Sequence, residues 1–346
     1  MNTAIPETPR ILTPDSPVIH ELQQRLSQSL EPRISNLPNG ILAVLFSGGL
    51  DCTLLARLSH DILPLSQPID LLNVAFENPR VAAAAAAREG QTVYETCPDR
   101  ITARAALREL QTTCPNRQWR LVAIDISYTE TLAHREHIKR LMRPHNTEMD
   151  LSIACALYFA ARGEGTLIPP TPQRTATTTP PVAYTTPSKI LLSGLGADEL
   201  FSGYGRHTIA FQKTSYAGLI AETALDVSRL GARNLGRDDR MLSNWGREAR
   251  FPFLDEGVVA WVVQLPIWEK CGFLPVSVSC PKDSSSSSSS SSGGSTGLNM
   301  PEKLALRLVA QNLGLENVAR EKKRAIQFGA RTAKMERGGT RGTDSL

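Results

Sequence analysis

The stretch Ile41–Asp51, ILAVLFSGGLD, joins an uncharged apolar run to a glycine-rich turn. The run from Ile41 to Phe46 is short and ends near glycine, which favours a buried parallel strand over a helix. The residues that follow, Leu50–Leu58, are predicted to form a helix. A strand, a glycine-rich turn and a helix N-terminus place free backbone N–H groups around one small space. Such a space binds phosphate, because the N–H groups and the helix dipole both attract an anion.

Within this turn, Gly48 and Gly49 let the backbone approach a phosphate without an intervening Cβ. Asp51 lies in the first helical turn, where it would repel a phosphate unless a cation lies between them. We therefore predict that Asp51 is a ligand of Mg²⁺. The alternative is a strand-to-helix turn that binds nothing, since Ser-Gly-Gly is common in loops.

The composition limits the class of protein. The chain has 346 residues, of which 41% are hydrophobic and 21% charged, as expected for a soluble globular protein with one or two domains. No segment has the pattern of a signal peptide or a membrane span, so no membrane partner is expected. The six cysteines show no CxxC pairs, which suits a reducing, cytoplasmic location. The net charge of +4 is too small to indicate nucleic acid as a partner.

Apolar runs alternate with segments of helical period along the first half of the chain. Predicted strands after the first lie at Leu71–Phe76, Trp119–Ile126 and Lys189–Leu192, and predicted helices at Ile19–Leu30, Asp99–Leu110 (capped by Asp99), Thr129–Met142 and Asp150–Arg162. This alternation predicts an α/β fold with a doubly wound parallel sheet. The ligand site of such a sheet lies at the carboxyl ends of its strands.

A second glycine-rich turn, Ser193–Phe201 (SGLGADELF), follows the predicted strand Lys189–Leu192. Both turns therefore meet at the same edge of the sheet. There Asp198 joins Asp51 as a pair of carboxylates for Mg²⁺, with substrate phosphates completing the octahedron. Ser47 and Ser193 can donate to phosphate or nucleotide. The alternatives are a strand-end cap by Ser193 and a helix N-cap by Asp198.

The kind of phosphate chemistry follows from the composition of the turns. Neither turn contains the GKS/T segment of the Walker phosphate loop. Without a loop lysine to hold the γ-phosphate, cleavage between the α- and β-phosphates is favoured. The products would be pyrophosphate and an adenylated carboxylate. Near the C-terminus, Lys322, Lys323 and Arg324 are candidates to neutralise the pyrophosphate, although such a run is often a solvated basic face or a nucleic-acid patch.

The predicted organisation has one large domain. Residues 1–35 are predicted to be disordered apart from a leader helix, and the domain covers 36–335 as an α/β core (40–205) and a C-terminal helical lobe (206–335). Low-complexity insertions interrupt the core at 81–97 and 163–188, a Ser/Gly linker interrupts the lobe at 282–298, and residues 336–346 form a disordered tail.

Three motifs together resemble the synthetase domain of the asparagine synthetase family, whose members are adenylating enzymes of the ATP-pyrophosphatase loop class. They are SGGLDC (47–52), SGLGADELFSGY (193–204) and RDDRMLSNWGREARFPFLD (237–255). The resemblance implies an α/β/α sandwich of the adenine nucleotide alpha hydrolase-like type. It also implies ATP and Mg²⁺ as cofactors, and an aspartate-like acid and ammonia as substrates. The family makes asparagine through an aspartyl adenylate.

The resemblance also assigns roles by position. It implies a pyrophosphate loop, two residues flanking adenine, two residues on the nucleotide and a shared metal. The pyrophosphate loop comprises Ser47, Gly48, Gly49, Asp51 and Cys52, and the residues that flank adenine are Leu45 and Ala75. The nucleotide is contacted by Ser193 and Gly194, and the metal is shared by Asp51 and Asp198. None of the three basic residues near the C-terminus can be singled out as the catalytic lysine.

Several positions depart from the family pattern. The family glutamate falls at Leu195, and leucine can neither transfer a proton nor hold ammonium. Cys52 replaces a serine, and at a helix N-terminus we expect its thiol pKa to be lowered. A family arginine falls at Ser152, which puts selectivity for aspartate in doubt.

The family also carries an N-terminal glutaminase domain whose nucleophile is the cysteine after the initiator Met. Here that position is Asn2, so we expect no glutaminase half in this chain. A glutaminase partner or a missing N-terminal domain both remain open. Two other functions also remain open: a catalytically silent binding or scaffold module, and a tRNA-modifying adenylating enzyme that uses the basic stretch 302–341.

Overall fold

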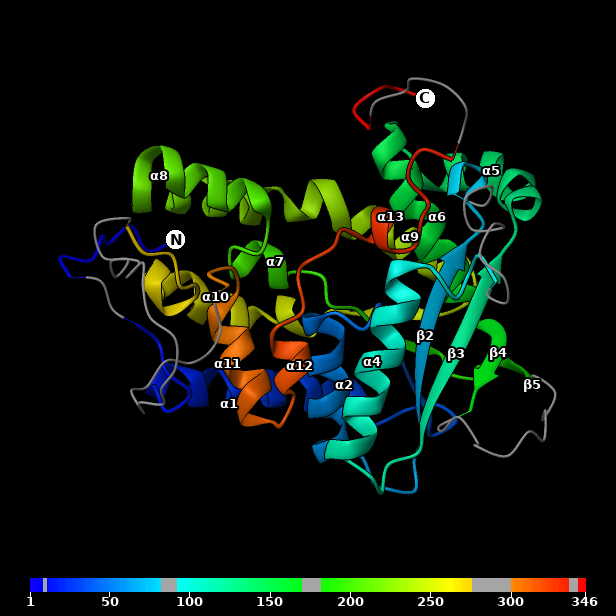
Figure 1. The fold of residues 1–346 in the computed structure, drawn as a ribbon, viewed down its shortest axis with the longest axis horizontal. Coiled ribbons are helices and arrows are strands. Elements are labelled where there is room, and N and C mark those ends of the chain that lie inside the picture. Colours follow the sequence, from blue (N-terminus) through cyan, green and yellow to red (C-terminus); the bar gives the residue numbers. More distant parts are fainter. Residues whose placement is uncertain (9–10, 82–91, 170–181, 276–299, 336–341) are drawn as a thin grey trace, which may run out of the picture.

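The computed structural model describes residues 1–8, 11–81, 92–169, 182–275, 300–335 and 342–346, and these contain a seven-stranded sheet between two layers of helices (Figure 1). The strands are β1 (Leu42–Leu45), β2 (Ile69–Phe76), β3 (Trp119–Ile126), β4 (Glu164–Ile168), β5 (Val182–Thr185), β6 (Ile190–Leu192) and β7 (Glu248–Arg250). Their order is β5-β4-β3-β2-β1-β6-β7. Five neighbouring strands, β3, β2, β1, β6 and β7, pair in parallel. At the other margin of the sheet, β4 pairs antiparallel with β3, and β5 pairs antiparallel with β4. The predicted α/β fold with a largely parallel sheet is confirmed.

The strand order places a topological switch point at β1. The chain moves outward from β1 to β2 and β3, and later returns to place β6 on the other side of β1. Crevices that bind ligands in open α/β sheets form at such points, outside the carboxyl ends of the strands. The two glycine-rich turns follow β1 and β6, so they flank this crevice.

Each side of the sheet is buried against its own layer of helices, because side chains alternate along every strand. Val44 of β1 and Leu192 of β6 belong to one core cluster. Their neighbours Ala43 and Leu191 belong to the other. This pattern is the α/β/α sandwich that the sequence predicts.

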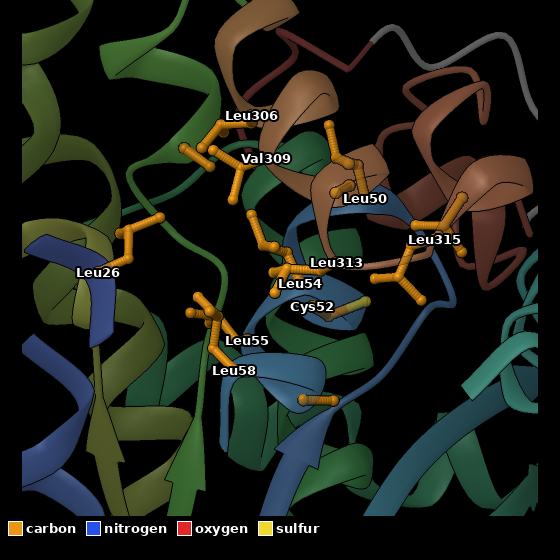
Figure 2. Packing of buried hydrophobic residues seen from close by; sticks show 14 of the residues in the cluster. Leu26, Leu50, Cys52, Leu54, Leu55, Leu58, Leu306, Val309, Leu313 and Leu315 are labelled. Carbon is orange, nitrogen blue, oxygen red and sulfur yellow. The ribbon is translucent and has the colours of Figure 1, made fainter. Parts of the chain in front are cut away.

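The first layer contains α1 (Pro17–Ile34), α2 (Leu50–Ile62), α4 (Pro98–Thr113), α10 (Glu256–Gln264), α11 (Leu304–Asn312) and α12 (Glu316–Ala319). Figure 2 shows the apolar face of α2, with Leu54, Leu55 and Leu58, near Leu306 and Val309 of α11. The second layer contains α5 (Tyr128–Met142), α6 (Glu148–Arg162), α9 (Gly236–Ser243) and α13 (Ile326–Gly329). Both layers combine helices from both halves of the chain.

The remaining helices are short or lie at the edge of the sandwich. They are α7 (Ala197–Leu200), α8 (Gly205–Leu230), the π-helix η1 (Gly231–Leu235) and the 3₁₀ helices η2 (Pro252–Leu254) and η3 (Ile267–Glu269). A third apolar cluster joins α8 to the η3 region through Tyr216, Leu219 and Ile267.

The predicted lobe at 206–335 is mostly helical, but it is part of the sandwich and contains a strand. Helices α9 to α13 complete the two layers of the sandwich, and β7 within this region pairs with β6. The prediction of a disordered insertion at 163–188 is wrong at its two ends, which form β4 and β5 at the antiparallel edge of the sheet, whereas 170–181 lie outside the described residues. Both strands are short and little buried, so they lack the apolar run that marks a central strand.

The two ends of the chain are more ordered than predicted. The leader helix is confirmed as α1, but the preceding residues are placed as well. The Asn2 amide donates to the Val263 carbonyl at 2.7 Å, and Leu12 is buried in the first core cluster. At the other end, Ser345 forms a bridge with Thr147. The Ser/Gly linker 282–298, most of the alanine run at 81–90 and part of the tail lie outside the described residues.

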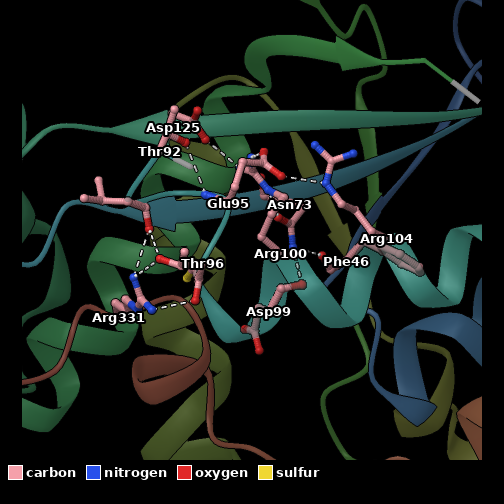
Figure 3. A network of polar contacts seen from close by, with 12 residues as sticks. Phe46, Asn73, Thr92, Glu95, Thr96, Asp99, Arg100, Arg104, Asp125 and Arg331 are labelled. Carbon is pink, nitrogen blue, oxygen red and sulfur yellow. Dashed lines mark hydrogen bonds and ion pairs between the residues drawn. The ribbon is translucent and has the colours of Figure 1, made fainter. Parts of the chain in front are cut away.

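The end of the predicted insertion 81–97 is fixed against the sheet by a buried arginine (Figure 3). The Arg100 guanidinium donates to Asn73 Oδ1 at 2.6 Å, Glu95 Oε1 at 3.0 Å and Asp125 Oδ1 at 2.6 Å. Asn73 in turn donates to the Phe46 carbonyl at 2.9 Å. Helix α4 begins here with Cys97 as its N-cap, so the prediction that Asp99 caps this helix is wrong.

The turn after β1 generates a prediction about stability. Gly48 has φ +77°, and a Cβ there would lie 2.4 Å from the Ala103 backbone nitrogen of α4. We expect Gly48→Ala to lower the free energy of unfolding by about 3 kcal/mol, from overpacking and left-handed strain combined. Urea denaturation measures the change. In the control, Gly231→Ala, the added methyl meets nothing within 4 Å, so we expect no destabilisation; equal losses in the two variants would contradict the prediction.

Candidate active site

The turn between β1 and α2 is held by short-range polar contacts. Ser47 Oγ accepts from the Gly49 amide at 3.3 Å and lies 3.6 Å from Cys52 Sγ. The Cys52 thiol also donates to the Gly49 carbonyl at 3.3 Å. Burial raises the pKa of this thiol. The expectation of a lowered Cys52 pKa at the helix N-terminus is therefore wrong, because the desolvation of a buried thiolate outweighs the helix dipole.

The second turn lies directly against the first. A Cβ at Gly194 would lie 3.0 Å from Cβ of Asp51, so glycine permits this close approach. Gly196 has φ +101°, which reverses the chain into α7 and its Asp198. The two predicted metal ligands, Asp51 and Asp198, consequently reach one location from different turns.

Between the two carboxylates lies a lysine that the sequence did not reveal. Lys303 Nζ is 2.8 Å from both carboxylate oxygens of Asp51 and 3.0 Å from Oδ1 of Asp198. Lys303 is only 2% exposed and precedes α11, more than one hundred residues after Asp198. Nothing in the local pattern around Lys303 marks it, apart from a charge immediately before an apolar helix.

The charges of this cluster set its protonation. Burial raises the pKa of Asp198, but the ammonium groups of Lys303 and Lys323 outweigh burial and lower it to about 2. For Asp51, burial dominates over its one close ammonium, and its pKa is raised. Burial lowers the pKa of Lys303, but the two carboxylates more than compensate, and its pKa is raised. These shifts favour a charged ion pair between Lys303 and Asp198 at neutral pH.

Of the three basic candidates near the C-terminus, Lys323 contacts this cluster. Its Nζ lies 3.2 Å from Asp198 Oδ2 and 4.4 Å from the ring centroid of Tyr204. Tyr204 donates to Glu199 Oε1 at 2.5 Å, which extends the cluster to a third acid. Tyr204 and Glu199 are further residues that the sequence analysis missed.

The neighbouring basic residues have other surroundings. Arg324 lies 3.7 Å from the buried carboxylate of Asp99 and donates to Thr102. Burial raises the pKa of Asp99 to about 7, although Arg324 opposes the shift. Lys322 is exposed and has no ion-pair partner among the described residues.

All of these groups line one cavity of about 520 Å³ at the carboxyl ends of β1 and β6. A cavity of this volume is typical of small-molecule sites. The predicted residues that line it are Leu45, Ser47, Gly49, Asp51, Cys52, Ser193, Gly194, Asp198, Lys322, Lys323 and Arg324, and Leu195 lines it as well. The two glycine-rich turns and the C-terminal basic segment, far apart in the sequence, therefore share one site.

Three predicted positions do not line this cavity. Ala75 is buried, and the β2 residues that line it are Leu72, Asn73 and Val74. Gly48 instead allows the close approach to α4. Ser152 donates to the carbonyls of Glu148 and Thr332, outside this cavity. Helix α6 presents Asp150 there in place of Ser152, because a shift of two residues along a helix changes the face.

The donor set fits Mg²⁺. This ion prefers oxygen ligands and is commonly bound by one or two carboxylates together with substrate phosphates. Asp198 Oδ1 is buried and lacks a hydrogen bond of good geometry, even though the Lys303 ammonium is close. The two carboxylates thus already share one cation and offer an acceptor for another.

Comparison with known proteins agrees with this geometry. Residues 212–339 match the asparagine synthase family model. The chain is 39% identical over 327 residues to asparagine synthetase domain-containing protein 1 of Mus musculus, across 88% of this chain and 47% of that protein. It is 39% identical over 323 residues to the Homo sapiens protein of the same name, across 86% and 46%. A putative glutamine-hydrolyzing asparagine synthetase of Methanocaldococcus jannaschii is 37% identical over 153 residues, across 42% and 28%.

These similarities confirm the resemblance to the asparagine synthetase family that the motifs predict. Over most of its length the chain is similar to the asparagine synthetase domain-containing proteins in particular. It spans about half the length of these relatives. No helix in the described part of the chain is long and apolar enough to cross a membrane.

The Lys303 cluster generates a prediction with a pH dependence. Lys303→Met leaves Asp51 and Asp198 buried with only Lys323 nearby, so we expect a loss of about 3–5 kcal/mol of unfolding free energy at pH 8. Without Lys303 the pKa of Asp51, already raised above its unfolded value of 3.8, rises further. A carboxyl group with a raised folded pKa loses stability as pH rises through that pKa, so the deficit should be smaller at pH 5.

Urea denaturation of wild type and variant at both pH values measures this deficit. In the wild type, the lowered pKa of Asp198 gives stability that is lost only as pH falls from 3.8 toward about 2, so this group adds no change between pH 5 and 8. Lys322→Met is the matched control, and we expect it to be nearly neutral. A deficit that is equal at the two pH values would contradict the prediction.

Proposed function

We propose that this chain binds Mg²⁺ and ATP in the cavity and adenylates a carboxylic acid, as the first half of an asparagine-synthetase-like ligase reaction. The observation that carries the proposal is the convergence of Asp51 and Asp198 with Lys303 and Lys323 at two glycine-rich turns. Anions bind at turns of this kind, and the asparagine synthase family supplies the class of reaction. The acid would be aspartate or a relative of it.

Each residue has a role in this reaction. The amides of the turn after β1 bind phosphate oxygens, while Asp51 and Asp198 would hold a magnesium ion, which would neutralise phosphate charge. An oxygen of the acid attacks the α-phosphorus of ATP, and the bond from that phosphorus to the α–β bridging oxygen breaks. Lys303 and Lys323 stabilise the charge that develops on the leaving pyrophosphate. Lys303 also keeps the carboxylates in position before the ligand arrives.

The second half of the reaction is where this chain departs from the family. Attack by ammonia on the acyl adenylate forms the amide, releases AMP and requires the loss of a proton from nitrogen. Leu195 lines the cavity at the position of the family glutamate and cannot accept that proton. This substitution is the specific observation that favours the second candidate function, a nucleotide-binding or scaffold module without turnover.

We further propose that the nitrogen source is free ammonia or a glutaminase supplied elsewhere, and that the protein acts in a reducing, cytoplasmic environment. Support for the latter comes from Cys52, Cys97, Cys114, Cys155 and Cys271, which are all buried free thiols.

Nucleotide binding tests the proposal directly. We expect isothermal titration to detect ATP binding that requires Mg²⁺, and Asp51→Asn to weaken it by at least about tenfold, or about 1.4 kcal/mol. Asp61→Asn is the matched control, since Asp61 lies at the exposed end of the same helix and pairs with Arg57. Absence of ATP binding in the wild type, or equal affinity in the two variants, would reject the nucleotide site.

Pyrophosphate release tests turnover. With ATP, Mg²⁺, aspartate and ammonium, we expect Leu195→Glu to release pyrophosphate and form asparagine faster than the wild type by at least about tenfold, since it restores an acid within the cavity. Leu195→Gln has a similar shape without a titrating group and is the control. A variant and wild type that are both silent, while still binding ATP, would favour the binding module over the ligase.

A further inference from the structure

Helix α8 reverses direction and brings an acid back to its own first turn. Its backbone leaves helical geometry at Thr214 (φ -138°) and Ser215 (φ 54°). A straight helix would separate positions 207 and 226 by about 28 Å along its axis. Instead, His207 Nε2 lies 2.9 Å from Asp226 Oδ2. The two parts of α8 therefore pack against each other, and Asp226 returns to the start of the helix.

His207 is fully buried and has a partner at each ring nitrogen. Its Nδ1 accepts from the backbone N–H of Tyr204 at 3.1 Å, so the proton of the neutral ring is on Nε2, which faces Asp226. Burial raises the pKa of Asp226, but His207 and Arg206 outweigh burial and lower it. The resulting negative charge stabilises the tautomer whose Nδ1 can accept. His207 and Asp226 thus fix the backbone at Tyr204.

The ring of Tyr204 lies close to two cations. Arg206 Cζ is 4.0 Å from the ring centroid, and Lys323 Nζ is 4.4 Å from it. Both distances fit cation–π contacts. Two cations at one ring repel each other, but Arg206 is 2.5 Å from Asp226 and 3.2 Å from Glu222. The acids of α8 therefore compensate the charge of Arg206, which leaves the ring available to Lys323.

Tyr204 can hold Lys323 when its other partner is engaged. Lys323 Nζ is 3.2 Å from Asp198 Oδ2, and Asp198 is also a proposed ligand of Mg²⁺. Burial raises the pKa of Tyr204, so its ring carries no charge, and its hydroxyl is already bound to Glu199. The ring thus keeps the Lys323 ammonium at the cavity while Asp198 binds elsewhere. Any shift of Tyr204 moves this contact.

We propose that His207 and Asp226 are positioning residues for Lys323 that act through Tyr204, and that they set how tightly the cavity binds a pyrophosphate group. This inference rests on the proposed function, in which Lys323 stabilises the leaving pyrophosphate. It adds a part of α8 that lies between the second and third motifs of the sequence and carries no glycine-rich turn.

The test measures binding without turnover. Isothermal titration of Mg²⁺-pyrophosphate and, separately, of AMP is carried out on the full chain. His207→Leu removes the acceptor for the Tyr204 N–H, and we expect it to weaken pyrophosphate by at least about tenfold and to leave AMP affinity unchanged. His207→Asn keeps an acceptor close to the position of Nδ1 and should restore most of the affinity. Asp226→Asn removes the charge that selects the tautomer, and it should weaken pyrophosphate as well.

A control on the same helix separates positioning from a general loss of α8 stability. Tyr216 donates a buried hydrogen bond to the Phe273 carbonyl at 2.8 Å and does not line the cavity. Tyr216→Phe removes this bond, and we expect it to bind pyrophosphate like the wild type. Thermal melting of each variant verifies that it is folded.

A double-mutant cycle tests whether His207 acts through Lys323. Lys323→Met should weaken pyrophosphate at least as much as His207→Leu, and combining the two should cause no further loss. Losses that add overturn the inference. So do an unchanged affinity in His207→Leu, an equal loss in Tyr216→Phe, and a His207→Asn variant that regains nothing.

The outcomes also separate this inference from the proposed function. If the wild type binds Mg²⁺-ATP but not Mg²⁺-pyrophosphate, or fails any of the comparisons above, the positioning role is wrong and the nucleotide site stands. If the wild type binds neither ligand, the inference and the proposed function are both rejected.

Discussion

The ammonium group of Lys303, between Asp51 and Asp198, is the interaction on which the site depends. Two carboxylates buried this close repel each other and lose hydration, at a cost of several kcal/mol if unpaired. One cation within 3.0 Å of both removes most of that cost. Because the three residues come from α2, α7 and the start of α11, the same contact joins both glycine-rich turns to the C-terminal third of the chain. The geometry of the crevice and the stability of the fold are therefore linked.

A second consequence concerns the basic segment before α13. Lys323 and Arg324 reach acids on opposite sides of the cavity, Asp198 and Asp99, while Arg307 holds the backbone that precedes them. The segment thus lies at the cavity with Lys323 and Arg324 paired to protein carboxylates. Bound phosphates would compete with those carboxylates for the same cations, so ligand binding and the position of this segment are coupled through charge.

Local pattern was a good guide to the fold wherever burial is complete. Trp119–Ile126 was predicted with the bounds of β3, and the helices at Thr129–Met142 and Asp150–Arg162 differ from α5 and α6 by at most two residues. Central strands and packed helices need long apolar runs or stripes, and these are visible without knowledge of the fold. The sequence did not predict β4, β5 and β7, because these short strands at the two margins of the sheet are only partly buried and lack a long apolar run. Such a strand forms by pairing with a neighbouring strand, and the local sequence does not show which strand that is.

The sequence by itself determined that two glycine-rich turns, each with an acid, meet at one edge of a parallel sheet, because strand direction and turn composition are local properties. Most of the site residues that it predicts line the cavity. Only the tertiary structure decided which cation lies between the acids, that Lys323 rather than Lys322 contacts Asp198, and that α6 presents Asp150 to the cavity in place of Ser152. These depend on contacts between residues up to about 250 positions apart and on helix rotation within a packed layer. Such contacts arise from the packing of the whole chain, which no short stretch of sequence encodes.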